Sequence, residues 1–165
     1  DSLILEFSPT MISLILAGKV GSSIASELGS MRATEQIDAL EIMGVNSASF
    51  LILPKIISSI LSFPFLVIIS MSIGMVGAWI GGLSTGVTTA DFMSGLKYDF
   101  KPFYISYAII KTLFFAFIVS SVSSYFGYHA KGGAISVGRS STKAVVYSSI
   151  IILMFNYILT DLILA

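Results

Sequence analysis

Few side chains in this sequence are of a type that could carry out chemistry. There is no cysteine and only one histidine, which excludes thiol catalysis, disulfides and metal sites built from cysteines or a histidine cluster. The segment GAISVGRS, Gly133 to Ser140, is similar to the phosphate-binding motif G-x-x-x-x-G-K-[ST], with arginine in place of the lysine. That motif lies between a strand and a helix, and no apolar strand precedes this segment. We therefore predict a loop leading into a helix, a chain that does not hydrolyse ATP itself, and no cofactor.

Two charged residues interrupt apolar stretches and are the first candidates for function. Lys111 lies about eight residues, or roughly 12 Å, into a predicted membrane span. A charge at that depth costs on the order of 3 kcal/mol, and such residues usually face protein or a cavity. We favour that position for Lys111 over snorkelling to the interface. Glu6 opens the first span at its outer end, where either a lipid pocket or a plain interfacial carboxylate fits the sequence.

The densest group of charges lies in residues 17–44, which hold four of the nine acidic residues of the chain. The second half of this segment predicts a short amphipathic helix, with Ser30 as its N-cap and Gly44 as its stop. Arg32 is spaced to pair with Glu35 or Gln36 one turn later. The apolar stripe consists of Ala33, Ile37 and Leu40, and the polar face consists of Thr34, Glu35, Asp38 and Glu41.

Two roles are open for this amphipathic helix. It could be a connector that rests on lipid headgroups, but helices that lie on anionic membranes are typically basic. This helix has three acidic residues and one basic residue, so a groove on a protein partner is the better interpretation.

Small residues recur at every fourth position in two segments. The first stripe is Ala17, Gly21, Ala25 and Gly29, and the second is Ser70, Gly74, Ala78 and Gly82, with Gly77 and Gly81 beside it. Such stripes allow two helices in a membrane to approach closely. The pattern does not distinguish packing within one subunit from a seam between two subunits, so both remain open.

The elements that position these residues are membrane helices. The chain of 165 residues is 55% hydrophobic and 11% charged, against about 25% charged in ordinary globular domains. A net charge of zero gives no indication of nucleic-acid binding. We predict an all-α, polytopic membrane protein with spans near 7–28, 60–82, 103–125 and 143–163. Pro54 and Pro64 lead us to predict a separate interfacial helix at 47–59.

The basic residues suggest how the spans are oriented. Segments 30–55 and 126–143 contain five of them, and the loop at 83–102 contains two. The positive-inside rule then places the first two segments, and with them the amphipathic helix, in the cytoplasm. The C-terminus is expected outside. Lys19 and Glu27, within the first span, are expected to bridge to other helices.

Several motifs are similar to those of one known family. The stretches AGKVGSSIASELGSMRATEQIDALEIMGV and LPKIISSILSFPFL, together with EFSP, IIKTLFF and GGAISVGRSSTKAVVYSS, resemble the MlaE permease family. These are membrane subunits of ABC-type lipid transporters that work with MCE-domain proteins. The resemblance covers essentially residues 1–165 as one permease domain. It implies that the family's N-terminal interfacial helix and first span are missing from the sequence given.

The resemblance also implies partners and roles. The amphipathic helix would be a coupling helix docked on a cytoplasmic ABC ATPase through Arg32, Glu35, Gln36, Asp38 and Glu41. Two permease copies would form a homodimer beneath an MCE-protein ring and hold a phospholipid near Glu6, Ile12 and Leu16. The location would be a bacterial inner membrane or a plastid inner envelope. The alternative is a secondary transporter or channel, which would need charged pairs in mid-membrane or broken helices with repeats.

Overall fold

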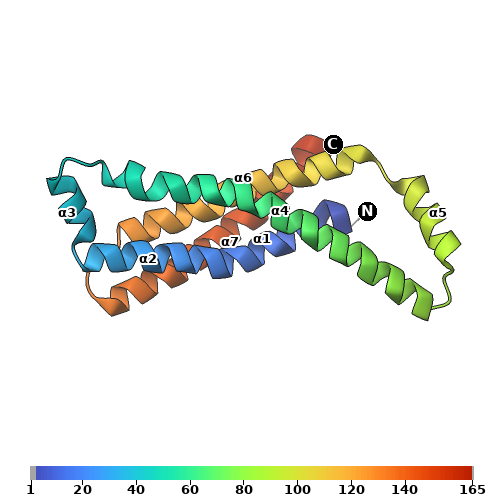
Figure 1. The fold of residues 1–165 in the computed structure, drawn as a ribbon, viewed down its shortest axis with the longest axis horizontal. Coiled ribbons are helices and arrows are strands. Elements are labelled where there is room, and N and C mark those ends of the chain that lie inside the picture. Colours follow the sequence, from blue (N-terminus) through green and yellow to red (C-terminus); the bar gives the residue numbers. More distant parts are fainter. Residues whose placement is uncertain (1–2, 165) are drawn as a thin grey trace.

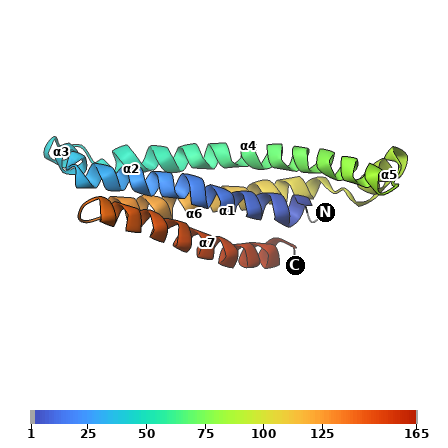
Figure 2. The same ribbon diagram turned by 90° about the horizontal axis from the view of Figure 1, so that it is seen from below.

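The computed structural model describes residues 3–164, and all regular structure in that range is helical. The elements are η1 (Leu3–Met11), α1 (Ile12–Leu16), η2 (Ala17–Gly21), α2 (Ser22–Ala33), α3 (Gln36–Ile42), α4 (Ser47–Ser84), α5 (Thr89–Asp99), α6 (Pro102–Tyr128) and α7 (Ala134–Leu164). The long helices run roughly along one axis and form an elongated bundle (Figures 1 and 2). The all-α prediction is confirmed.

Four helices are long and apolar enough to cross a membrane. They are Leu5–Ala33, Ser47–Ser84, Pro102–Tyr128 and Ala134–Leu164. Each contains one of the four predicted spans, so the expected multi-pass architecture is confirmed. A span needs about 20 apolar residues, and all four exceed this length.

The predicted division of the second apolar region is wrong. We expected an interfacial helix at 47–59 and a separate span, but α4 continues through Pro54 and Pro64 as one helix of 38 residues. Asn46 caps its start by accepting a hydrogen bond from the Ser49 backbone N–H at 3.3 Å. Proline removes one backbone donor, a loss that membrane helices tolerate when neighbouring groups compensate. Each proline therefore disturbs α4 without ending it.

The first span is less regular than its sequence suggests. Two wide-turned π-helical segments, η1 and η2, flank the short α1, and η1 contains Pro9. Such wide turns are rare and occur often at functional sites. Glu6, one of the candidate residues, lies in η1.

Helix α6 is the centre of the bundle. It packs against η1, α2, α4 and α7, and Figure 2 shows α4 and α7 on opposite sides of the bundle. The main apolar cluster includes Phe63 from α4, Phe115 and Val119 from α6, and Ile152 from α7. These side chains are at most 2% exposed. Because the cluster joins α4 and α7 to α6, it holds those two spans in position against α6.

The two ends of the bundle differ. The α2–α3–α4 connection and the α6–α7 turn lie at one end, whereas both termini face the other way (Figure 1). The two segments predicted to be cytoplasmic therefore share one end. At the other, the last part of α4 extends beyond the bundle to α5, which has no buried residue (Figure 1).

Candidate functional site

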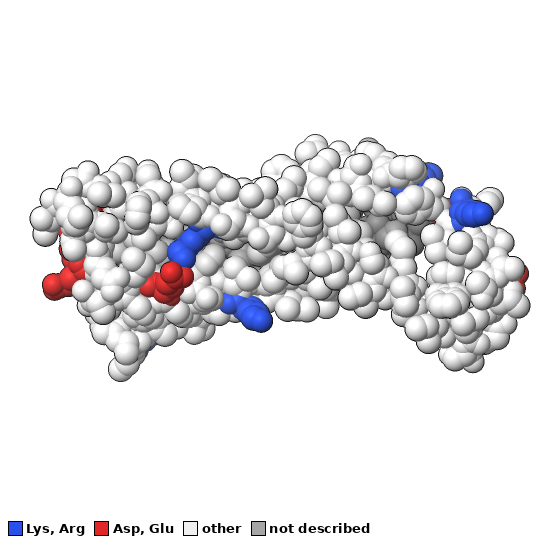
Figure 3. Space-filling model, in the orientation of Figure 1, with Lys and Arg blue, Asp and Glu red and all other residues white. Residues whose placement is uncertain are grey.

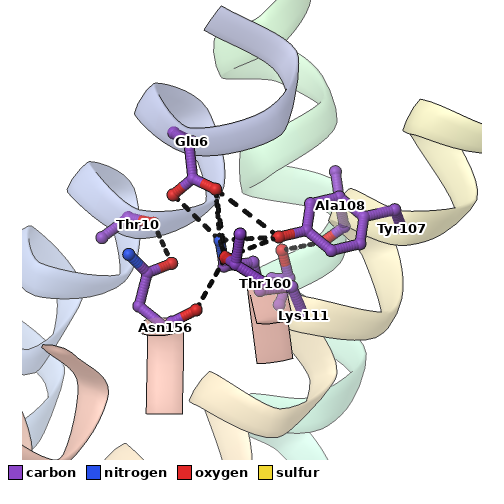
Figure 4. Close-up of polar contacts among 8 residues, drawn as sticks. Glu6, Thr10, Tyr107, Ala108, Lys111, Asn156 and Thr160 are labelled. Carbon is purple, nitrogen blue, oxygen red and sulfur yellow. Dashed lines mark hydrogen bonds and ion pairs between the residues drawn. The ribbon is translucent and has the colours of Figure 1, made fainter. Parts of the chain in front are cut away.

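The polar cluster around Lys111 is the most enclosed arrangement of charges in the described chain. The Lys111 side chain is fully buried, and its Nζ lies 3.1 Å and 3.0 Å from the two carboxylate oxygens of Glu6. Nζ also donates to Tyr107 Oη at 3.1 Å and to Thr160 Oγ1 at 3.2 Å (Figure 4). An ammonium has three N–H donors, and four oxygen atoms lie within hydrogen-bond distance, so each donor has an acceptor. The burial cost of this charge is offset by these contacts.

Three spans build this cluster. Glu6 comes from η1, Tyr107 and Lys111 are one turn apart on α6, and Thr160 lies on α7. A second contact extends it, because Thr10 Oγ1 donates to Asn156 Oδ1 at 3.1 Å (Figure 4). The Glu6 side chain is 39% exposed, so the cluster is closed on the lysine side and open on the carboxylate side.

The pairing of Glu6 with Lys111 was missed from the sequence. Each residue was considered alone, although opposite charges at membrane depth usually pair with one another. The two residues are 105 positions apart, and no local periodicity connects them. The available signal was the opposite sign of two charges in apolar surroundings.

The predicted lipid-pocket residues Ile12 and Leu16 lie one turn apart on α1 and are both half-buried within the chain. Ile12 packs against the small cluster of Val67, Met71 and Ala108, and Leu16 packs against the main core. The outward face of the first span is instead formed by Phe7, Met11 and Ile15, which are at least half exposed. A ligand that approaches this span from outside the subunit would meet these three side chains beside Glu6.

The amphipathic helix α3 lies at the end of the bundle and starts later than predicted. Helix α2 runs through Ser30 to Ala33, so Ser30 is not an N-cap. The chain turns instead at Glu35, which has a left-handed backbone (φ 63°), an unusual conformation for a non-glycine residue. Gly44 follows the helix with φ 81°, as its predicted role as the stop requires.

A cluster that we call the α3 anchor holds this helix to two spans. Arg32 Nε donates to the Tyr128 carbonyl at 2.9 Å, and the guanidinium lies 4.5 Å from the centre of the Tyr128 ring. Glu41 accepts from Tyr128 Oη at 3.2 Å and from Ser47 Oγ at 3.1 Å. The α3 anchor therefore consists of Arg32, Glu41, Ser47 and Tyr128.

The predicted partners of Arg32 are wrong. Its guanidinium pairs with Asp38 at 3.2 Å, and not with Glu35 or Gln36. The reason is the chain reversal at Glu35, which breaks the one-turn spacing on which the prediction depended. Of the predicted apolar stripe, Ile37 is fully buried and Leu40 is half-buried, but Ala33 is exposed and ends α2. Glu35, Gln36, Asp38 and Glu41 are exposed, and Figure 3 shows acidic side chains gathered at this end of the molecule.

The two small-residue stripes lie in different environments. A Cβ at Gly21 would lie 2.8 Å from Ser123 Oγ, and one at Gly29 would lie 3.2 Å from Val137. The first stripe thus packs inside this chain. Gly77 and Gly81, beside the second stripe, have nothing within 4 Å and face outward, whereas Ser70, Gly74 and Gly82 of the stripe itself are half-buried.

The closest approach of two helices was not predicted. A Cβ at Gly127 would lie 2.7 Å from the Ala25 carbonyl oxygen and 2.9 Å from Leu28 Cβ. Ser123 and Gly127 on α6 are spaced as a small-residue pair, which was the available signal. The first stripe therefore packs against a matching stripe on α6.

Comparison with known proteins gives a consistent set of relatives. Residues 1–162 match the family model described as Permease MlaE. A probable ABC transporter permease protein of Rickettsia bellii is 40% identical over 162 residues, which are 98% of this chain and 62% of that protein. Protein TRIGALACTOSYLDIACYLGLYCEROL 1, chloroplastic, of Arabidopsis thaliana is 35% identical over 94% of this chain and 45% of its own length. The chain thus spans less than two thirds of these curated relatives.

Proposed function

This chain belongs to the MlaE permease family, and from that premise we propose that it is the membrane subunit of an ATP-driven phospholipid transporter. A separate cytoplasmic ABC ATPase would hydrolyse ATP. Two copies of the chain and an MCE-domain protein would complete the assembly and move phospholipid between an inner and an outer membrane. The bacterial and chloroplast relatives fit either a bacterial inner membrane or a plastid envelope.

The observation that carries the proposal is the position and attachment of α3. Its exposed carboxylates lie at one end of the bundle, where an amphipathic helix suits a groove on a soluble partner. The α3 anchor connects this helix to α4 through Ser47 and to α6 through Tyr128. A displacement of α3 by a partner would therefore be passed to two membrane helices.

The experiment that tests this function uses the full-length protein, purified from membranes with whatever binds it. We expect an ATPase subunit to co-purify. The complex in liposomes should transfer a labelled phospholipid to acceptor particles only with hydrolysable ATP. Transfer that is driven by an ion gradient without ATP would refute the proposal.

A specific observation favours one rival, a secondary transporter. Such proteins use charged pairs within the membrane, and Glu6–Lys111 is an ion pair between two spans, with Glu6 at the outer end of the first span. The structure lacks the other expected feature, since none of the four spans between residues 3 and 164 is interrupted at its centre by a non-helical segment. The ATP requirement in the transfer experiment distinguishes the two functions.

A further inference from the structure

A groove between the first span and α4 is separate from both the Lys111 cluster and α3. It is a shallow groove of about 390 Å³ that is largely open to the surroundings. It runs along α4 from Lys55 at one end to Leu66 at the other, and Val20 and Ile24 of the first span form its opposite wall. The groove lies on helices that cross the membrane, so lipid is the surrounding medium.

Lys55, which lines one end of the groove, forms an ion pair with Glu27, which lies beside the groove. Lys55 Nζ lies 2.7 Å from Glu27 Oε2, and the side chains are 20% and 58% exposed. Lys55 directly precedes a stretch, residues 56–90, that contains no charged residue. The pair therefore marks the level at which hydrocarbon gives way to headgroups, on the α3 side of the bundle.

The rest of the groove is mostly apolar and has the length of an acyl chain. Lys55 and Leu66 are separated by about 16 Å along α4 at 1.5 Å per residue. Val20, Ile24 and Phe63 supply apolar walls. Ser58 and Ser62 make no side-chain hydrogen bond within residues 3–164, although a hydroxyl facing hydrocarbon is costly without a partner. The ester groups of a lipid would supply acceptors for these hydroxyls.

We propose that this groove binds one phospholipid whose headgroup carries both a phosphate and an amine, from the leaflet on the α3 side. The phosphate lies against Lys55, the ammonium against Glu27, and one acyl chain follows the groove toward Leu66. A lipid whose headgroup carries only a negative charge would be attracted by Lys55 but repelled by the Glu27 carboxylate. The groove should therefore prefer headgroups that carry both charges. The inference does not depend on the proposed function, because it requires binding and not transport.

The test measures which lipids the full-length protein keeps. The protein is reconstituted with equal amounts of phosphatidylethanolamine and phosphatidylglycerol, extracted in mild detergent without ATP or partner, and examined by native mass spectrometry. We expect several-fold enrichment of phosphatidylethanolamine. Glu27→Gln should abolish the preference, and Lys55→Met should reduce retention of both lipids. The matched control is Lys97→Met, which removes an exposed lysine on α5 and should change nothing.

A second measurement covers the case in which these variants fold poorly. A photoreactive amino acid is placed at Ser62, inside the groove, or at Leu61, which is 63% exposed to the surroundings. Cross-linked phosphatidylethanolamine should be enriched at position 62 and should match the bulk mixture at position 61. Equal lipid ratios at both positions, or capture of a protein segment at position 62, would overturn the proposal. Neither measurement detects lipid transfer. A negative result here would therefore leave the proposed function standing, and a failure of the transfer experiment would leave the lipid-binding groove standing.

Discussion

Lys111 is surrounded by oxygen atoms from three spans, whereas its carboxylate partner is open on one side. The asymmetry matters because a fully buried ammonium has no route to water when its partner is removed. Glu6 is 39% exposed and can still be solvated. Breaking the pair from the two sides should therefore have unequal consequences.

The first prediction concerns this asymmetry. Glu6→Ala should destabilise the protein by about 3–5 kcal/mol, because it leaves a buried charge uncompensated. Lys111→Met should cost less, and the double variant Glu6→Ala/Lys111→Met should resemble Lys111→Met alone. Unfolding in mixed micelles measures this, with Lys97→Met as the matched control. Equal losses for the two single variants would contradict the enclosed position of Lys111.

The second prediction concerns glycines at contact and at open positions. Gly127→Leu should prevent assembly of α2 against α6, because a Cβ alone would lie 2.7 Å from a backbone oxygen. Gly21→Leu should cost about 1–3 kcal/mol, the usual range for overpacking. Gly77→Leu should leave the fold of the single chain intact, since nothing lies within 4 Å. Thermal unfolding of each purified variant provides the comparison.

Gly77→Leu also addresses the alternative that the sequence left open. If the second stripe forms a seam between copies, this variant folds normally but loses dimer in cross-linking and size measurements. If the variant still forms a dimer, the stripe faces lipid. A loss of the monomer fold would contradict its exposed position.

At the scale of the element, the helices were easier to predict than their ends. Apolar stretches of sufficient length located all four spans, because burial of backbone groups in lipid permits little except helix. Pro54 suggested a break that α4 does not have. Ser30 suggested a helix start, but the chain turns five residues later, at Glu35. Both predictions were wrong because they relied on the local preference of one residue type, which the surroundings of the helix overrode.

The candidate site was predictable only in part, and for a related reason. The acidic face of α3 repeats at helical spacing and is visible in the sequence. The Glu6–Lys111 pair and the α3 anchor connect residues far apart in the chain, and only the packing of α6 against the first span brings them together. The wide turns of η1 likewise have no periodic signal.

The third prediction concerns α3. Glu35→Lys and Gln36→Lys should each weaken association with the proposed ATPase partner about tenfold, with a strong dependence on salt, because a charge at an interface rim acts mainly through steering. Neither side chain makes a hydrogen bond within residues 3–164, so the fold should be unaffected. Binding of the purified ATPase to the protein in nanodiscs measures this. Glu35→Gln removes the negative charge without adding a positive one, so it separates loss of attraction from new repulsion.

Tyr128→Phe is the complementary variant. It removes the hydroxyl that contacts Ser47 and Glu41 but leaves the exposed face of α3 unchanged. We expect the ATPase to bind normally and lipid transfer per ATP to fall. Normal coupling in this variant would show that the α3 anchor does not transmit movement.

At the scale of the whole molecule, the outward face of the first span, where we expect the transported lipid to lie, and the proposed groove occupy different parts of the bundle. The outward face of the first span lies beside Glu6, in η1, whereas the groove begins near Lys55 on the α3 side. A transported lipid should leave the first of these when ATP is hydrolysed, while a bound lipid in the groove should stay. One experiment can therefore separate cargo from resident lipid.

The fourth prediction is that ATP turnover divides the lipids of the full-length complex into two sets. Mass spectrometry before and after incubation with ATP and acceptor liposomes should show loss of a mixed set of phospholipids and retention of an amine-bearing one. In the fraction of Glu6→Ala complex that remains folded, only the set of lipids that is lost should shrink. Ser62→Trp, which fills the groove, should remove only the set that stays. Recovery of a soluble solute and no phospholipid would refute the lipid function, whereas an unchanged profile in Glu6→Ala would exclude Glu6 from the transport site.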